Sequence, residues 1–175
     1  PGGFSFGDYL RCGAIAARSP IVQSVIEFAK GGGYVIGICN GFQVLTESGL
    51  LPGVLMRNSN LKFICKDVDL IVKTTDSAFT NRYTKGQKIR VPIAHHDGNY
   101  TADPDTLSQL KDQDRIAFTY AVNPNGSMAD IAGILSENRR VLGMMPHPER
   151  LNDPQLGGTD GAGMFESLAE ALVSA

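Results

Sequence analysis

The sequence of 175 residues lacks any apolar run close to the roughly 18 residues that a membrane-spanning helix requires. It also lacks a cluster of Lys or Arg residues, and its formal net charge is −2. Such a composition gives no electrostatic basis for binding nucleic acid or an anionic membrane surface. We therefore expect neither nucleic acid nor a membrane among the partners of this chain.

Cysteine and histidine are both scarce, with three of each. Cys12, Cys39 and Cys65 are odd in number and show no CxxC spacing, so neither a disulfide framework nor a metal site is expected, and a reducing cytoplasmic location is favoured. The hydrophobic content of 42% and the charged content of 19% are ordinary for a globular protein. A single domain over residues 1–175 is the natural interpretation.

Helical and extended patterns alternate in the first part of the chain. Ser19 and Pro20 are typical of a helix start, and a helical stripe then runs to the glycines at 31–33. An apolar strand at 34–38 and a second helical pattern follow. This order predicts an α/β fold with a mostly parallel open sheet and helices on both faces.

The rest of the chain is richer in strands. The pattern predicts a short helix at 106–111, and a final helix with Met164, Phe165, Leu168 and Leu172 on one face. It predicts strands at 61–65, 68–74, 88–94, 116–120, 131–135 and 141–145. Residues 136–140 form a hairpin connection, which gives the sheet an antiparallel section.

The most informative stretch is 34–43, Tyr-Val-Ile-Gly-Ile-Cys-Asn-Gly-Phe-Gln. A short strand, a cysteine flanked at two residues on each side by glycine, and a helix form the pattern of a nucleophile elbow. Gly37 and Gly41 remove the Cβ atoms that would crowd the turn. Cys39 would lie at a helix N-terminus, which favours the thiolate. The alternative is a buried structural cysteine, as we interpret Cys12 and Cys65.

A cysteine nucleophile needs a base and a group that orients the base. His147 lies between two prolines in Met-Pro-His-Pro-Glu, residues 145–149, which predicts an extended segment with Glu149 on the same side as His147. A carboxylate at one ring nitrogen fixes the tautomer and leaves the other nitrogen for the thiol. His95 and His96 are the rivals, and one of them could line the pocket or lie in a surface loop.

Two segments could supply an oxyanion hole. The amide after the nucleophile belongs to Asn40, and the glycine-rich loop with Gly2 and Gly3 could supply a second donor. This loop lacks the lysine and the Ser or Thr of a phosphate-binding loop, so we do not expect it to hold ATP.

Taken together, these motifs resemble the triad-type (class I) glutamine amidotransferases. The 37–43 elbow and Pro-His-Pro-Glu at 146–149 carry this likeness. Pro-Gly-Gly-Phe-Ser-Phe-Gly-Asp-Tyr-Leu-Arg-Cys-Gly-Ala at 1–14, together with residues 57–58, 121–127 and 143–150, narrows it to the glutaminase subunits of phosphoribosylformylglycinamidine synthase. The resemblance implies a flavodoxin-like amidotransferase fold and covers essentially the whole chain.

The resemblance also implies roles. Cys39 would attack the glutamine amide, with His147 oriented by Glu149. Additional residues would form the oxyanion hole or contact substrate: Gly3, Asn40, Gln43, Asn58, Ser59 and His95. Ammonia would pass to a separate synthetase subunit, which uses ATP and Mg to make the amidine in purine synthesis, and a small third subunit would assist assembly. No cofactor is expected in this chain.

Two departures from the family pattern are apparent. The family's strand–helix–strand unit before the Pro-Gly-Gly loop is missing, so the chain is expected to be truncated at its N-terminus. His96 and Asp97 replace the Gly-Glu that usually follows the position of His95. Three alternatives stay open: a glutaminase serving another synthetase, a γ-glutamyl hydrolase, and a catalytically silent partner-binding subunit.

Overall fold

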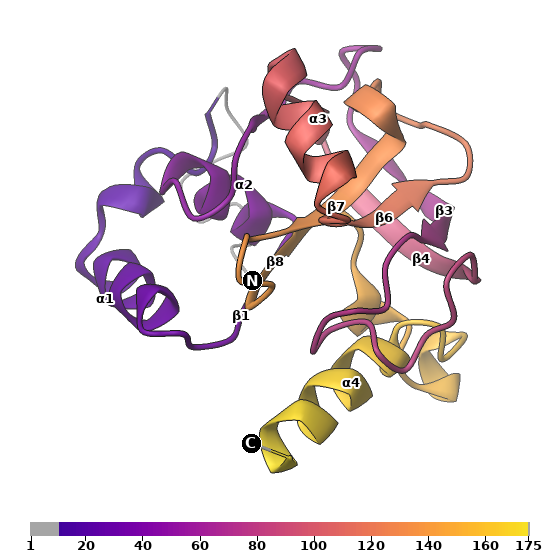
Figure 1. Ribbon diagram of the computed structural model, residues 1–175. Coiled ribbons are helices and arrows are strands. Elements are labelled where there is room, and N and C mark those ends of the chain that lie inside the picture. The colour runs from indigo at the N-terminus through magenta and orange to yellow at the C-terminus, as the bar shows by residue number, and fades with distance from the viewer. Residues whose placement is uncertain (1–10, 175) are drawn as a thin grey trace.

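The computed structural model describes residues 11–174, and its centre is a curled six-stranded sheet with the order β1-β8-β7-β6-β3-β4 (Figure 1). A separate two-stranded sheet pairs β2 with β5. The strands are β1 (Val35–Ile38), β2 (Val54–Met56), β3 (Ile64–Val72), β4 (Lys88–His95), β5 (Asn99–Thr101), β6 (Ile116–Tyr120), β7 (Ile131–Leu135) and β8 (Val141–Met144). The α-helices are α1 (Pro20–Lys30), α2 (Asn40–Glu47), α3 (Pro104–Asp112) and α4 (Ala162–Val173). Short 3₁₀ helices are η1 (Ala16–Arg18), η2 (Met128–Asp130), η3 (Pro148–Arg150) and η4 (Pro154–Leu156).

The α/β class is confirmed, but the described part of the sheet is less parallel than the sequence suggested. Only β1 and β8 run parallel there, and the pairs β8–β7, β7–β6, β6–β3 and β3–β4 are antiparallel. For one of these pairs the cause is a short connection, since the predicted hairpin at 136–140 can join β7 and β8 only in opposite directions. The sheet is therefore mixed.

Helices cover both faces of the sheet, as expected. Neighbouring residues of β8 illustrate this, because Val141 belongs to one core cluster and Leu142 to the other. Phe42 of α2 and Leu110 of α3 pack in the first cluster, whereas Met164 of α4 packs in the second. Figure 1 shows α4, in yellow, on the opposite side of the sheet from α3.

Local patterns located most elements but not all of them. The two strands predicted at 61–65 and 68–74 are one nine-residue strand, β3, which pairs with β4 from Ile64 to Ile71. The short strands β2 and β5 were not predicted, because three residues are too few to show a period. Ser19 caps α1 as the sequence indicated, with its Oγ accepting from the amide of Val22 at 3.4 Å.

Candidate active site

The predicted elbow is present at the end of β1. Cys39 joins β1 to α2 with φ 53° and ψ −107°, a backbone conformation that is costly for any residue with a Cβ atom. A Cβ at Gly37 would contact Leu45 and lie 2.7 Å from the carbonyl carbon of Gly41. The strand and the helix therefore cross where only hydrogen fits, and this close crossing supports the strained turn.

Contacts with two other strands, β8 and β4, hold the elbow in place. The amide of Cys39 donates to the carbonyl of Met144, at the end of β8, at 2.8 Å. The Sγ atom of Cys39 lies 3.6 Å from the carbonyl oxygen of Ala94 on β4. The thiol is buried, with 5% of the residue exposed.

His147 is anchored to the same edge of β4. Its amide donates to the carbonyl of Pro92 at 2.8 Å. Carbonyls two residues apart on a strand point the same way and lie roughly 7 Å apart. Because the carbonyl of Pro92 accepts from the amide of His147 and the carbonyl of Ala94 lies against the thiol of Cys39, both residues are held at the same end of β4, which the curl of the sheet brings to the ends of β1 and β8.

The side chains of His147 and Glu149 form a hydrogen-bonded pair. Nδ1 of His147 lies 2.6 Å from Oε1 of Glu149. The contact was predicted, but the extended geometry was wrong: His147 is the residue before η3, and Glu149 lies within this 3₁₀ helix. Pro148 at the first helical position favours the turn, since its fixed φ suits a helix start. Among residues 11–174, Nε2 of His147 has no hydrogen-bond partner.

The charge state of Glu149 follows from two opposing effects. Burial raises its pKa, but the hydrogen bond and the charge interaction with His147 outweigh burial, so the pKa of Glu149 is lowered from its ordinary value. The carboxylate thus remains ionised, and a negative charge beside Nδ1 stabilises a protonated imidazole.

A family model for the CobB/CobQ-like glutamine amidotransferase domain matches residues 1–157. Over 175 residues, the chain is 68% identical to the phosphoribosylformylglycinamidine synthase subunit PurQ of Ruegeria sp. (strain TM1040), spanning 100% of this chain and 79% of that relative. It is 70% identical over 168 residues to PurQ of Cereibacter sphaeroides, spanning 96% of this chain and 76% of that one. The chain belongs to the PurQ family of glutamine amidotransferases.

A solved structure agrees with this assignment. The structure of PurLQS from Thermotoga maritima superposes with a TM-score of 0.90 at 48% sequence identity, over 98% of this chain and 77% of that chain. The resemblance inferred from the elbow and the Pro-His-Pro-Glu motif is therefore confirmed at the level of both family and fold.

His95 lies beside the pair, in a buried position. Its Nδ1 lies 3.0 Å from Oδ1 of Asn58, and its Nε2 has no hydrogen-bond partner among the described residues. Burial, reinforced by the nearby charge of His147, lowers the pKa of His95 to about 4. His95 is therefore neutral at ordinary pH, which suits it to accepting or donating a hydrogen bond but not to carrying charge.

Asn58 holds this histidine. Its Nδ2 donates to the carbonyls of Lys62 at 2.8 Å and His95 at 3.0 Å, and its Oδ1 also accepts from the amide of Gly98 at 3.1 Å. The side chain of Asn58 is thus occupied by the protein itself. Ser59 is exposed, and its amide donates to the carbonyl of Asn125 at 2.9 Å.

The elbow helix contributes two buried polar side chains. Nδ2 of Asn40 donates to Oε1 of Gln43 at 2.8 Å, and Nε2 of Gln43 donates to the carbonyl of Asp97 at 2.8 Å. The amide of Asn40 is at the first position of α2, where no carbonyl of the helix can reach it. Gly3, the other expected oxyanion donor, lies outside the described residues.

Sequence reasoning missed three contributors. The carbonyl of Ala94 contacts the thiol, and a backbone oxygen leaves no trace in residue type. Tyr120 is buried, and burial raises its pKa; an interaction with Asn125 lowers the pKa and a weaker charge interaction with Cys39 raises it. Asp97, 1% exposed, accepts from Nε of Arg57 at 3.1 Å and from Sγ of Cys12 at 3.3 Å. The only sequence signal for Asp97 was that it replaces the glutamate usual at this position of the family motif.

The remaining cysteines differ from one another. Of the two interpreted as structural, Cys12 is buried against Asp97, whereas Cys65 is exposed on β3. Residues 11–174 contain no group of three or more His, Cys, Asp or Glu arranged to hold a metal ion. No helix among these residues is long and apolar enough to cross a membrane.

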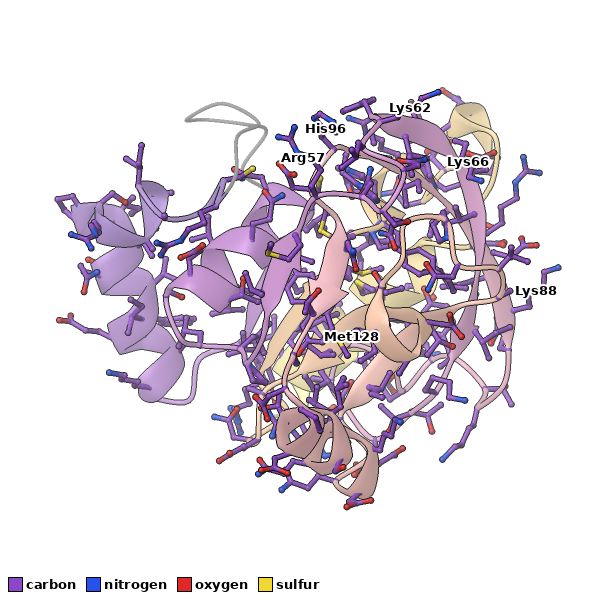
Figure 2. The ribbon with its side chains drawn as sticks, turned by 90° about the horizontal axis from the view of Figure 1, so that it is seen from above. Arg57, Lys62, Lys66, Lys88, His96 and Met128 are labelled. Atoms are coloured by element: carbon purple, nitrogen blue, oxygen red, sulfur yellow. The ribbon has the colours of Figure 1, made fainter. Side chains whose placement is uncertain are left out.

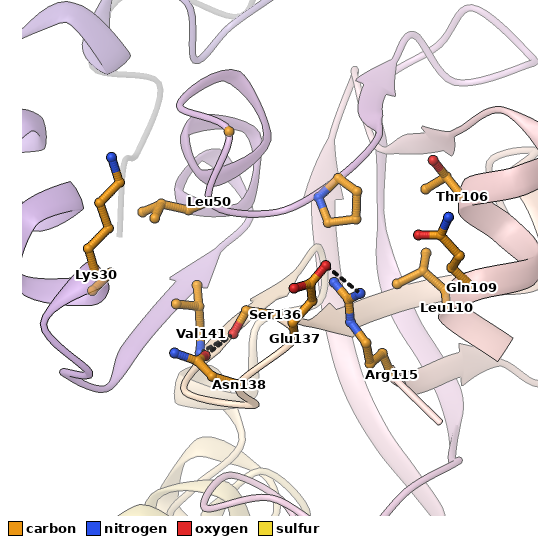
Figure 3. Close-up of a pocket in the computed structure, with 13 residues that line it drawn as sticks. Lys30, Leu50, Thr106, Gln109, Leu110, Arg115, Ser136, Glu137, Asn138 and Val141 are labelled. Atoms are coloured by element: carbon orange, nitrogen blue, oxygen red, sulfur yellow. Dashed lines mark hydrogen bonds and ion pairs between the residues drawn. The ribbon is translucent and has the colours of Figure 1, made fainter. Parts of the chain in front are cut away.

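A cavity of about 500 Å³ lies away from the candidate triad, at the starting end of β8 (Figure 3). Arg115 and Glu137, which both line it, form an ion pair with 3.8 Å between Nη1 and Oε1. None of Cys39, His147 and Glu149 lines this cavity.

Proposed function

We propose that this chain hydrolyses the side-chain amide of glutamine through a thioester on Cys39. The observation that carries the proposal is that a cysteine at φ 53° and the histidine of the His147–Glu149 pair are held by carbonyls two residues apart on β4. The half-buried Glu149, hydrogen-bonded to Nδ1 of His147, supplies the orienting group that a nucleophile and its base require.

The reaction has two halves, formation and hydrolysis of the thioester, and His147 transfers protons in both. Nε2 of His147 takes the thiol proton as Sγ of Cys39 bonds to the amide carbon. The same Nε2–H then protonates the nitrogen as the C–N bond breaks, which releases ammonia and leaves a γ-glutamyl thioester. Water, deprotonated by His147, attacks the thioester, and glutamate leaves as the thiol regains its proton. Glu149 stabilises the imidazolium in both halves.

The oxyanion that develops at the amide carbon needs donors. The free amide of Asn40 is one, and Gly3 is the second by its place in the family motif. Each such donor contributes about 3 to 4 kcal/mol to transition-state stabilisation. His95 lies at the same end of β4, and its buried Nε2 has no hydrogen-bond partner among the described residues, so this nitrogen is the atom through which we propose that His95 contacts bound glutamine.

The ammonia is proposed to pass to a synthetase subunit that binds ATP and Mg and converts formylglycinamide ribonucleotide into its amidine. Support comes from relatives named as phosphoribosylformylglycinamidine synthase subunit PurQ and from the solved PurLQS structure. A small third subunit would assist assembly. This chain would itself need no cofactor, and the complex would work in the cytoplasm.

The decisive experiment combines mass analysis with a glutaminase assay. A glutamine-analogue alkylating agent should label Cys39 alone, and Cys39→Ala should abolish hydrolysis while synthetase binding persists. Glutaminase activity in Cys39→Ala would overturn the proposal. Preference for γ-glutamyl peptides over glutamine would favour a γ-glutamyl hydrolase instead.

The assignment of the base has its own test. His147→Ala should slow thioester formation by about 10²- to 10⁴-fold. If His95→Ala reduced this rate more than His147→Ala did, His95 would be the base.

A further inference from the structure

The segment of residues 56–66, here called the 56–66 arm, exposes apolar and cationic side chains together. Leu61 is 69% exposed, Phe63 is 50% exposed and Met56 is 38% exposed. The arm carries three cations, Arg57, Lys62 and Lys66, and no acidic residue. Within residues 11–174, neither Lys62 nor Lys66 forms an ion pair. Figure 2 shows Arg57, His96 and Lys62 along one side of the molecule.

The backbone of the arm is strained where it is most exposed. Leu61 has φ 58°, in the left-handed region that costs a residue with a Cβ atom about 1 kcal/mol or more. The exposed side chain of Leu61 buries too little apolar surface in the isolated chain to offset this cost. Strain of this kind persists where the surrounding structure enforces it, and it points to a function for the side chain.

The surrounding contacts do enforce it. The amide of Leu61 donates to the carbonyl of Asn58 at 2.8 Å, and the carbonyl of Leu61 lies 3.0 Å from Nε2 of His96. The amide of Lys62 donates to Oδ1 of Asn60 at 3.0 Å. Leu61 is therefore presented in a fixed position, which lowers the entropy lost when a partner binds it.

The arm is also connected to the candidate active site. Asn58 within the arm binds the buried ring of His95. Arg57 binds Asp97, whose carbonyl in turn accepts from Gln43 of the helix that begins at Cys39. These hydrogen bonds place the arm next to the candidate active site. A partner that receives ammonia has to bind close to that site, and the arm is an exposed surface there.

We propose that the 56–66 arm is a docking surface for the synthetase subunit, whose facing surface carries acidic groups around an apolar pocket for Leu61. This inference rests on the proposed function, which supplies the partner. A second copy of this chain fits poorly, because a symmetric contact would bring Lys62 and Lys66 of one copy against the same two cations of the other, while Arg57 is already paired with Asp97. A nucleic acid fits poorly as well, because the whole chain has a net charge of −2.

The test measures binding of the full-length subunit to its synthetase partner by calorimetry and by association kinetics. Leu61→Gly should weaken binding about tenfold, as for loss of a buried anchor. Its thermal midpoint should not fall, since glycine adopts a positive φ freely. Lys62→Glu should slow association at low salt, with the difference shrinking as salt screens the charges.

Lys111→Glu is the matched control, because Lys111 is an exposed cation on α3 and outside the 56–66 arm. It should bind like the unaltered subunit, and basal glutaminase activity should be unchanged in all three variants. Unaltered binding by both Leu61→Gly and Lys62→Glu would overturn the docking surface, as would self-association through the arm in sedimentation. If the unaltered subunit did not bind the synthetase at all, the proposed partner would be wrong. The Cys39→Ala assay tests the proposed glutamine hydrolysis independently of this binding.

Discussion

Nδ1 of His147 and Oε1 of Glu149 lie 2.6 Å apart with a single proline between the two residues in sequence. The turn of η3 produces this contact, and Pro148 limits the conformations that compete with it. A carboxylate this close to the ring selects the tautomer that carries hydrogen on Nδ1. Nε2 is then left as the lone-pair nitrogen that a thiol requires.

Removing the charge of Glu149 should impair catalysis more than binding. Glu149→Gln keeps the size of the side chain but cannot stabilise the imidazolium electrostatically, so kcat for glutamine hydrolysis should fall about 10²- to 10⁴-fold with little change in KM. Steady-state kinetics with and without the synthetase would measure this. Glu166→Gln, at an exposed position of α4, is the control and should leave kcat unchanged. A fall in kcat no larger than that of the control would contradict the role of Glu149.

The strain at the elbow should be measurable as stability. Cys39→Gly and Cys39→Ala both lose the thiol, but only alanine keeps a Cβ atom at φ 53° and ψ −107°. We expect the glycine variant to unfold at a higher urea concentration than the alanine variant. Its free energy of unfolding should be larger by about 1 kcal/mol, a figure that already subtracts the greater flexibility of glycine in the unfolded chain. Equal or reversed midpoints would show that the turn is not strained.

Crowding at the strand–helix crossing should make Gly37 hard to replace. In Gly37→Ala the new methyl group would lie 2.7 Å from backbone atoms of Gly41, which cannot move aside as a side chain could. Overpacking of this kind costs about 1 to 3 kcal/mol, measured by denaturant unfolding. Gly31→Ala is the control, because its methyl group would meet atoms at 3.4 Å, an ordinary contact. Equal stability of the two variants would contradict the tight crossing.

The buried state of His95 should make stability depend on pH. Burial and the charge of His147 lower the pKa of His95 from 6.5 to about 4. Between these values the unfolded chain binds a proton that the folded chain excludes, so stability falls as pH decreases from 6.5 toward 4. The contribution is complete above pH 6.5, and its loss by pH 4 is on the order of 3 kcal/mol.

His95→Asn isolates this contribution, because its amide can still donate to Asn58 without titrating. Urea unfolding at pH 7 and pH 5 should show a smaller difference for His95→Asn than for the unaltered protein. His96→Gln should retain the full difference, since His96 is only partly buried. An undiminished pH dependence in His95→Asn would assign the titration to other groups.

Much of the site could be predicted because its signals are local. The elbow depends on a strand, a cysteine and a helix within ten residues, and Gly37 meets Gly41, the second residue of that helix. The contact between His147 and Glu149 spans two residues. Its detailed geometry was missed, since Pro148 suits the first position of a 3₁₀ helix as well as an extended segment.

The sequence by itself determined which side chains can carry the chemistry: Cys39, His147 and Glu149, each identified by residue type and by immediate neighbours. Only the tertiary structure decided that Cys39 and His147 are held at the same end of β4, through the curl of the sheet that brings Pro92 and Ala94 to the ends of β1 and β8. It also decided that Asp97 joins Cys12, Gln43 and Arg57. Strand direction and curl arise from pairings between distant segments, and backbone carbonyls are the same in every residue. Neither long-range strand pairing nor a backbone carbonyl produces a hydrophobic period or a characteristic residue type, so neither could be predicted from the sequence.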